Sequence, residues 1–286
     1  MQKPSGLPEE LAKLDRTLVM GVLNVTPDSF SDGGKFNSAQ IAIDYARQMV
    51  DDGADIVDIG GESTKPGAQR ISVEQELDRV IPVITQLAKD GIVISVDTMR
   101  AQVAKEAVQA GAKLINDVSG GKADPDMFSF LTTNSLPYIM MHWRGFSTEM
   151  MHLTDYDDVL LDVCDELQNQ VNAAVSAGVE LSRIALDPGI GFAKTVEQNW
   201  PILAGVADLQ DLGLPLLIGV SRKKFLGELL TKNGEPRDVS QREAATVAVT
   251  TLLAAQSVWA VRVHDVKSSS DAIKVVHRIQ QEQLNG

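Results

Sequence analysis

The sequence is short of cysteine and of basic residues, and each shortage argues against a class of protein. Cys164 stands alone, so no intrachain disulfide can form and nothing points to an oxidising compartment. The 26 lysines and arginines against 39 aspartates and glutamates give a net charge of -13. That acidic excess argues against nucleic acid or an anionic membrane as a partner. An anionic substrate would therefore require a local cluster of positive side chains.

Long apolar runs are also missing, because no stretch reaches the length of a membrane span. Residues 1–16 are polar, contain Pro4 and Pro8, and lack the apolar core of a signal peptide. We therefore expect a cytoplasmic protein in which residues 1–16 form an N-terminal extension. The sequence also lacks a Walker loop, a Gly-x-Ser-x-Gly elbow and zinc-ligand spacing among its four histidines.

What the chain does contain is an alternation of short β-branched runs with longer amphipathic runs. The predicted strands are residues 18–23, 56–59, 92–96, 113–115, 138–141, 184–186, 216–220 and 259–263. The predicted helices are residues 39–50, 73–89, 102–110, 157–177, 242–255 and 270–283. Glycine or proline breaks fall between these units.

This alternation predicts an α/β fold in which a parallel sheet is covered by helices. In a chain of 286 residues, closure into a single (β/α)8 TIM barrel is the economical arrangement, and we assign residues 1–286 to one domain. An open, doubly wound sheet is the alternative. It usually has fewer strands, and no Gly-x-Gly-x-x-Gly follows the first strand here.

Polar residues follow every predicted strand. They are Asn24, Glu62 with Lys65, Asp97, Asn116, His142, Asp187, Ser221 with Lys223, and Arg262 with His264. In a barrel all strand ends open on one face, where the active sites of this fold are built. Loops are polar in general, so a single such residue means little, but convergence of the whole set predicts a binding site.

The set divides by chemistry. Carboxylate and amide acceptors suit a flat ligand edge rich in N–H groups, such as a pterin or guanine-like ring, and they come from Asp97, Asn116 and Asp187. Cationic and imidazole groups follow strands seven and eight, where barrels commonly bind phosphate, and they come from Lys223, Arg262 and His264. These residues supply the local positive charge that an anionic substrate requires.

Some of these residues also have a purely structural interpretation. Asp97 can act as a helix N-cap, Asp187 can cap the turn that begins at Pro188, and Asn116 can organise its loop. A Mg²⁺ ion held by Asn24, water and a substrate diphosphate is compatible with the sequence, because that cation often uses few protein ligands.

Seven strings of this sequence resemble those of a known family. The two longest are GVLNVTPDSFSDGG at residues 21–34 and DIGGESTKPG at residues 58–67. Shorter strings follow in the same order: SVDT at 95–98, INDV at 115–118, LDPGIGF at 186–192, SRK at 221–223 and VRVHD at 261–265. The chain thus resembles the dihydropteroate synthases, which are pterin-binding enzymes, from about residue 18 to the C-terminus.

The resemblance implies a TIM-barrel transferase of folate biosynthesis. Such enzymes condense 6-hydroxymethyl-7,8-dihydropterin pyrophosphate with p-aminobenzoate to give 7,8-dihydropteroate and pyrophosphate. Pyrophosphate departs with the help of the cofactor Mg²⁺, and the neutral aryl amine then attacks the pterin cation. Catalysis in this SN1-like reaction rests on orientation and on stabilising the leaving group, so no strong base is needed. Sulfonamides mimic p-aminobenzoate and would be expected to compete with it.

The resemblance also implies roles for individual residues. The pterin would be held by Asp97, Asn116, Asp187 and Lys223. Pyrophosphate would be held by Asn24, Arg262 and His264, with Asn24 also binding the metal. Asp32, in the first loop, would stabilise the cation and act in catalysis with Lys223, Arg262 and His264. The p-aminobenzoate pocket would be formed by Phe30, Thr64, Lys65, Pro66, Phe192 and Lys224.

The sequence departs from many relatives at two positions. Lys65 stands where many have arginine, which keeps the charge but loses the fork of donors. Lys224 stands where many have a small serine, close to a helix N-terminus whose backbone N–H groups can still bind a carboxylate. We expect unaltered chemistry with a changed affinity for p-aminobenzoate or sulfonamides.

Two other functions compete with the synthase. A pterin-dependent corrinoid methyltransferase would keep the aspartates but needs no pyrophosphate site, so Arg262 and His264 favour the synthase. A catalytically silent pterin-binding paralogue would be expected to have substitutions at Asp97, Asp187, Lys223 or Arg262, and all four residues are present in this sequence. The family also forms homodimers through late barrel helices. The apolar run 244–255 is compatible with such an interface and equally with packing against the strands.

Overall fold

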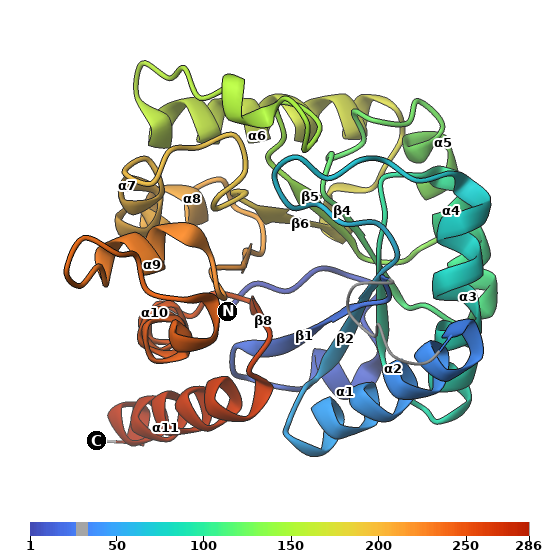
Figure 1. Ribbon diagram of the computed structural model, residues 1–286, viewed down its shortest axis with the longest axis horizontal. Helices are drawn as coiled ribbons and strands as arrows, with labels where there is room; N and C mark the ends of the chain where they lie inside the picture. The colour runs from blue at the N-terminus through green and yellow to red at the C-terminus, as the bar shows by residue number, and fades with distance from the viewer. Residues whose placement is uncertain (27–33, 286) are drawn as a thin grey trace.

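Eight parallel strands form one sheet in the order β6-β5-β4-β3-β2-β1-β8-β7 (Figure 1). The computed structural model describes residues 1–26 and 34–285. The strands are β1 (Leu18–Asn24), β2 (Ile56–Gly60), β3 (Ile94–Asp97), β4 (Leu114–Asp117), β5 (Tyr138–Met141), β6 (Ile184–Asp187), β7 (Leu217–Ile218) and β8 (Ala260–Val263). Every interstrand pairing in the sheet is parallel, as the near-continuous apolar runs predict.

The two ends of this sheet meet, so the sheet is a barrel. Leu186 of β6 forms a parallel bridge with Leu216, immediately before β7. The N–H group of Leu186 also donates to the carbonyl of Pro215 at 2.8 Å. The expected (β/α)8 barrel is therefore confirmed, and the open doubly wound sheet is excluded.

Helices surround the strands on the outside of the barrel (Figure 1). The long ones are α2 (Gly34–Asp51), α3 (Val73–Lys89), α4 (Ala101–Ala110), α6 (Val159–Ser176), α10 (Glu243–Ala255) and α11 (Val266–Asn285). The short ones are α1 (Glu9–Ala12), α5 (Met127–Thr132), α7 (Asn199–Ala204), α8 (Val206–Gln210) and α9 (Lys224–Leu229), with 3₁₀ turns at Met150–His152, Leu181–Arg183 and Val239–Gln241. The predicted helices correspond to the long ones. The short helices were not predicted, because fewer than two turns give little periodicity.

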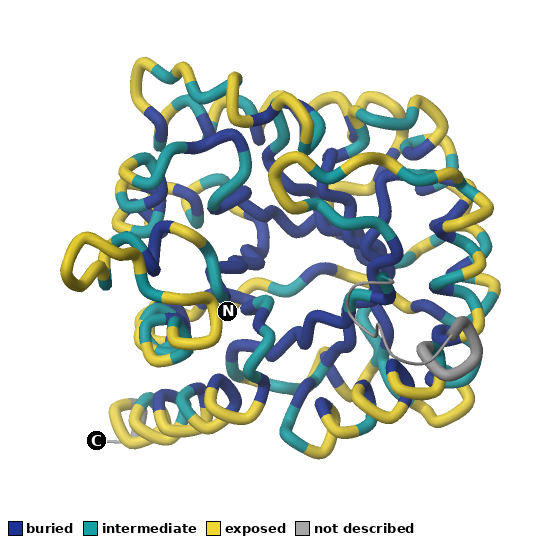
Figure 2. Tube along the Cα trace, in the orientation of Figure 1, coloured by how far each residue is buried: buried dark blue, intermediate teal, exposed yellow. Residues whose placement is uncertain are grey.

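Side chains of each strand alternate between the interior of the barrel and the strand–helix interface. Apolar residues facing outward pack against the helices in one large core, for example Val57, Ile94 and Val261. Residues facing inward at the amino ends of the strands form a second core, which includes Leu18, Met20, Ile56 and Leu217. Burial is concentrated along the strands, and the outer sides of the helices are exposed (Figure 2).

The N-terminal extension closes the end of the barrel at which the strands begin. Leu11 on α1 is only 3% exposed and packs with Leu18, Ala185 and Trp259 in the inner core. Residues 1–16 therefore contribute to the barrel core and are not merely an appended segment. Apolar side chains fill the barrel at the amino ends of the strands. The polar groups of a site therefore have room only at the carboxyl ends. No helix in the described part of the chain is both long and apolar enough to cross a membrane.

Candidate active site

A buried polar cluster lies at the carboxyl ends of β2, β3, β4 and β8. Arg262 donates from Nε to Asp58 Oδ2 at 2.6 Å and from Nη2 to Asp97 Oδ2 at 2.8 Å. Asn116 donates from Nδ2 to the same Asp58 oxygen at 3.0 Å. The cluster thus joins Asp97 and Asn116, expected to bind the pterin, to Arg262, expected to bind pyrophosphate.

Strand register explains why these side chains meet. Asp97 pairs with Asn116 across β3 and β4, and Gly60 pairs with Asp97 across β2 and β3. A Cβ atom added to Gly60 would lie 3.5 Å from the Asp97 carboxylate, so Gly60 packs closely against that group. Asp58 is two residues earlier on the same inward-facing side of β2.

Burial and crowding of carboxylates shape the electrostatics of this cluster. Removal from water, together with the charges of Asp58, Glu76 and Asp117, raises the pKa of Asp97 to about 7, although Arg262 acts in the opposite direction. Burial lowers the pKa of Arg262, but the two aspartates outweigh it and the guanidinium pKa is raised. The arginine therefore stays charged, and Asp97 can titrate near neutral pH.

A second charged pair, in which Asp187 is buried and Lys223 is half-buried, lies at the ends of β6 and β7. Asp187 and Lys223 attract each other electrostatically. Burial raises the pKa of Asp187 and lowers that of Lys223 to about 8, and in each case the partner's charge acts against the shift. Lys223 Nζ donates to the carbonyl of Ile190 and lies 4.9 Å from the centre of the Phe192 ring. The structure thus places three expected site residues, Asp187, Phe192 and Lys223, together.

Lys223 is presented by a tight turn after β7. Arg222, just before it, adopts a left-handed backbone conformation with φ of 63°, which is uncommon for a residue with a side chain. The turn is tied down because Arg242 Nη1 donates to the Arg222 carbonyl at 2.9 Å and the Arg222 side chain pairs with Glu243. Two contacts from α10 and its N-terminal residue therefore hold the conformation that aims Lys223 inward.

His264 follows β8 and is held by Ser221. Its Nδ1 lies 3.0 Å from Ser221 Oγ, and its backbone N–H donates to the same oxygen at 3.1 Å. Burial, followed by the charges of Arg222, Arg262, Lys223 and Lys65, lowers the pKa of His264 to about 3. The imidazole is therefore neutral near pH 7, so it can offer an anion only a hydrogen bond and no charge.

The residues expected to bind p-aminobenzoate are only partly brought together. Thr64 and Asp97 line the same small cavity, and the charge of Lys65 acts on His264. Pro66 is exposed in the same β2–α3 loop. Lys224 is the first residue of α9, but its side chain is 77% exposed and its Nζ lies 3.6 Å from Glu228. Phe30 and Asp32 lie outside the described residues.

Asn24 ends β1 and pairs in register with Gly60, so it stands at the mouth of the barrel. Within residues 1–26 and 34–285, no group of three or more His, Cys, Asp or Glu side chains could hold a metal ion. The nearby carboxylates of Asp58 and Asp97 are engaged by Arg262. A single amide oxygen fits Mg²⁺ only if water and the substrate diphosphate complete the coordination shell, which is a common arrangement for this ion.

Two features of the site were missed by sequence reasoning. Asp58 received no role, although a charged residue inside the apolar run Ile56–Gly60 is a recognisable signal. His142 was expected to open onto the site with the other strand ends, but its ring is fully buried between Lys194 and Glu166. The histidine therefore contacts Lys194 of the β6–α7 loop and is not exposed at the site.

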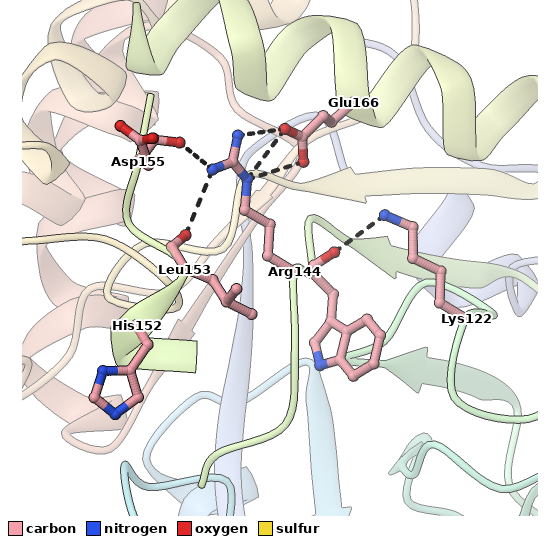
Figure 3. A pocket seen from close by; sticks show the side chains of 7 residues that line it. Lys122, Arg144, His152, Leu153, Asp155 and Glu166 are labelled. Carbon is pink, nitrogen blue, oxygen red and sulfur yellow. Dashed lines mark hydrogen bonds and ion pairs between the residues drawn. The ribbon is translucent and has the colours of Figure 1, made fainter. Parts of the chain in front are cut away.

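A larger pocket, of about 450 Å³, is lined by residues of the β4–α5 and β5–α6 loops and of α6 (Figure 3). Its lining residues are Lys122, Trp143, Arg144, His152, Leu153, Asp155 and Glu166. The Arg144 guanidinium lies between Glu166 and the carbonyls of Leu153 and Asp155, so most of its N–H donors are already used. None of the residues expected to bind the substrates lines this pocket.

Comparison with known proteins agrees with this site. Residues 20–264 match the family model of the pterin binding enzymes. The dihydropteroate synthase of Mycobacterium leprae (strain TN) is 47% identical over 260 residues, which cover 90% of this chain and 92% of that protein. The chain therefore belongs to the pterin-binding enzymes, and within that family it has the activity of the dihydropteroate synthases, which are transferases.

Solved structures give the same answer. Xanthomonas albilineans dihydropteroate synthase with 4-aminobenzoic acid is 40% identical, with a TM-score of 0.86 over 93% of this chain and 94% of that one. The Yersinia pestis dihydropteroate synthase in a sulfonamide drug complex is also 40% identical, with a TM-score of 0.87 over 98% of each chain.

Proposed function

We propose that the chain condenses 6-hydroxymethyl-7,8-dihydropterin pyrophosphate with p-aminobenzoate at the carboxyl end of the barrel, with Mg²⁺ as cofactor. The observation that carries this proposal is the cluster in which Arg262 bridges Asp58 and Asp97 while Asn116 binds Asp58. In this cluster a pterin edge would meet carboxylate and amide acceptors, and the diphosphate would lie beside the permanent cation Arg262. A methyltransferase has no use for the second group.

The pterin would lie on the buried acceptors. Asp97, Asn116 and Asp187 would accept hydrogen bonds from its ring N–H and amino groups, and Lys223 would donate to a ring acceptor. Three of these four side chains are less than 9% exposed: Asp97 at 8%, Asn116 at 4% and Asp187 at 7%. Such contacts gain strength from the exclusion of water and fix the orientation of the methylene carbon.

Arg262, neutral His264 and Asn24 would hold the diphosphate. Mg²⁺, bound to the diphosphate and Asn24, would supply charge neutralisation for the departing pyrophosphate. Arg262 would donate N–H groups to the oxygens on which charge develops, and His264 would add a hydrogen bond. The amine of p-aminobenzoate would then attack from the side of Phe192 and the β2–α3 loop, and Asp32 would stabilise the cation before attack.

The test is turnover of purified protein with pterin pyrophosphate, p-aminobenzoate and Mg²⁺, following dihydropteroate and released pyrophosphate. Equal yields of both products, lost in Asp187→Ala and on removal of the metal with EDTA, are expected. Pterin binding without turnover would support a catalytically silent paralogue. Absence of pterin binding would refute the proposed site.

We also propose that the protein acts in the cytoplasm as a homodimer. Helices α10 and α11 pack against each other, and both carry exposed apolar side chains: Leu252 is 63%, Val275 is 60% and Ile279 is 55% exposed. A second copy of the chain would cover this face. Light scattering should give twice the chain mass for the wild type and the monomer mass for Leu252→Glu. A monomeric wild type would refute the dimer.

A further inference from the structure

A lysine that no sequence string singled out lies buried within the β6–α7 loop. Lys194 is 2% exposed. Its Nζ donates to the carbonyls of Gly189 and Phe192, each at 3.1 Å, and lies 3.0 Å from Nδ1 of His142. Burial lowers the pKa of Lys194 to about 7, although the charge of Asp187 acts in the opposite direction. In its ammonium form the side chain has three N–H donors, and these contacts occupy all of them. The side chain therefore joins both ends of the segment 189–192 to His142, the residue that follows β5.

The His142 end of this contact is itself fixed. Nε2 of His142 lies 3.0 Å from Oε2 of Glu166, and Arg144 Nε donates to the other oxygen of that carboxylate at 3.1 Å. Figure 3 shows the Arg144 guanidinium facing Glu166 and the loop carbonyls. Burial and the charge of Lys194 lower the pKa of His142 to about 4. The neutral ring therefore donates from Nε2 to Glu166 and accepts from Lys194 at Nδ1.

The loop needs such ties because its backbone is unusual. Gly189, Gly191 and Ala193 all have positive φ, of 65°, 77° and 47°. For Ala193 this conformation is strained, and it persists only when neighbouring contacts enforce it. Tyr156 supplies one such contact, because its hydroxyl donates to the Ala193 carbonyl at 3.0 Å.

This loop contacts or contains residues proposed to bind p-aminobenzoate and the pterin. The Gly189 N–H donates to Asp187 Oδ1 at 2.7 Å, and the Ile190 carbonyl accepts from Lys223. The Phe192 ring lies beneath Lys223 Nζ. The carbonyls that Lys194 holds belong to Gly189 and Phe192, which flank the acceptor of Lys223. A shift of the loop would therefore move Asp187, Lys223 and Phe192 together.

We propose that Lys194, held by His142 and Glu166, is a positioning residue that sets the β6–α7 loop for binding p-aminobenzoate and the pterin. The inference rests on the proposed function of the loop residues. In this role Lys194 acts through the loop and does not itself contact a substrate. The pyrophosphate group of the site, Arg262 with His264, makes no contact with this loop among the interactions of the described residues, so it should be independent of Lys194.

The experiment compares Lys194→Met with Lys122→Met. Lys122 donates to the Trp143 carbonyl at 3.0 Å in the adjoining pocket and has no contact with the loop. Loss of a charged donor to the loop should raise the KM for p-aminobenzoate about tenfold in Lys194→Met. Inhibition by added pyrophosphate with Mg²⁺ should stay within about twofold of wild type. Lys122→Met should leave both constants unchanged.

Wild-type turnover in the same assay tests the proposed function separately from this inference. An unchanged KM in folded Lys194→Met, or an equal loss of p-aminobenzoate and pyrophosphate affinity, would overturn the positioning role. Should that variant fail to fold, Tyr156→Phe removes one oxygen and one contact to the same loop. It should raise the same KM about threefold, and an unchanged value would count against the proposal.

Discussion

Asp58 is the residue whose replacement would tell most about the site, because it holds Arg262 and Asn116 without reaching the surface. Both donors use the same oxygen, Oδ2, and Oδ1 has no hydrogen-bond partner. In Asp58→Asn, the amide oxygen can keep both contacts while the new NH₂ group occupies the unpaired position. The variant therefore loses charge assistance to Arg262 and buries one unpaired donor. Together these should destabilise the fold by about 2 kcal/mol.

The same substitution should change the pH dependence of activity. The charge of Asp58 raises the pKa of Asp97, which is about 7 in the wild type. Removing that charge favours the ionised form of Asp97 and so lowers its pKa, while Arg262 keeps its contact with Asp97. If the pterin requires ionised Asp97, the acid limb of kcat/KM should move down by about one pH unit.

Urea unfolding and kcat/KM measured over a range of pH would test both effects. Asp55→Asn is the matched control, because Asp55 precedes the same strand and pairs with Arg16 at 2.7 Å, near the opposite end of the barrel. The control should lose stability while its acid limb stays in place. An acid limb that does not move in Asp58→Asn would refute the proposed coupling between Asp58 and Asp97.

Other substitutions test separate parts of the structure. Leu11→Ala should cost about 3 kcal/mol of unfolding free energy, because it opens a cavity in the inner core, and a loss below about 1 kcal/mol would show that α1 does not seal the barrel. His264 has a folded pKa of about 3, below its unfolded value, so its contribution to stability is present above about pH 6.5 and is lost as pH falls toward 3. The difference in unfolding free energy between wild type and His264→Asn should therefore shrink between about pH 6.5 and 4, and a constant difference would contradict the shift. Lys65→Arg should change the KM for p-aminobenzoate or the inhibition constant of a sulfonamide. Identical constants in the variant and the wild type would contradict the expectation that Lys65 alters these affinities.

The barrel could be predicted from the sequence because its signals are local. Each strand is a short apolar run, and each is followed by a polar residue at its carboxyl end. The weakest strand, β7, is only Leu217–Ile218, although the apolar run extends over residues 216–220. The chain leaves the sheet at Gly219, where a Cβ atom would lie 3.4 Å from the Cβ of Arg262. The sequence around Gly219 does not reveal that the Arg262 side chain packs there, because the two residues are far apart in the chain.

The expected substrate residues were identifiable for the same reason, but their supports were not. Asp58 and Arg262 are 204 positions apart, and Lys194 and His142 are 52 apart. A single sequence does not reveal which buried charges compensate each other over such separations. His142 shows the resulting error, because its position at a strand end was recognised while its burial behind the loop was not.

The place where the barrel closes has a consequence for ligand binding. The contact between β6 and β7 rests on few backbone interactions, and β7 is the shortest strand. Asp187 and Lys223 stand on opposite sides of this join, and each is proposed to bind the pterin. A bound pterin would then contact both β6 and β7 and stabilise the part of the barrel with the fewest backbone hydrogen bonds. Binding would therefore slow hydrogen exchange along β6 and β7 more than along β2 and β3.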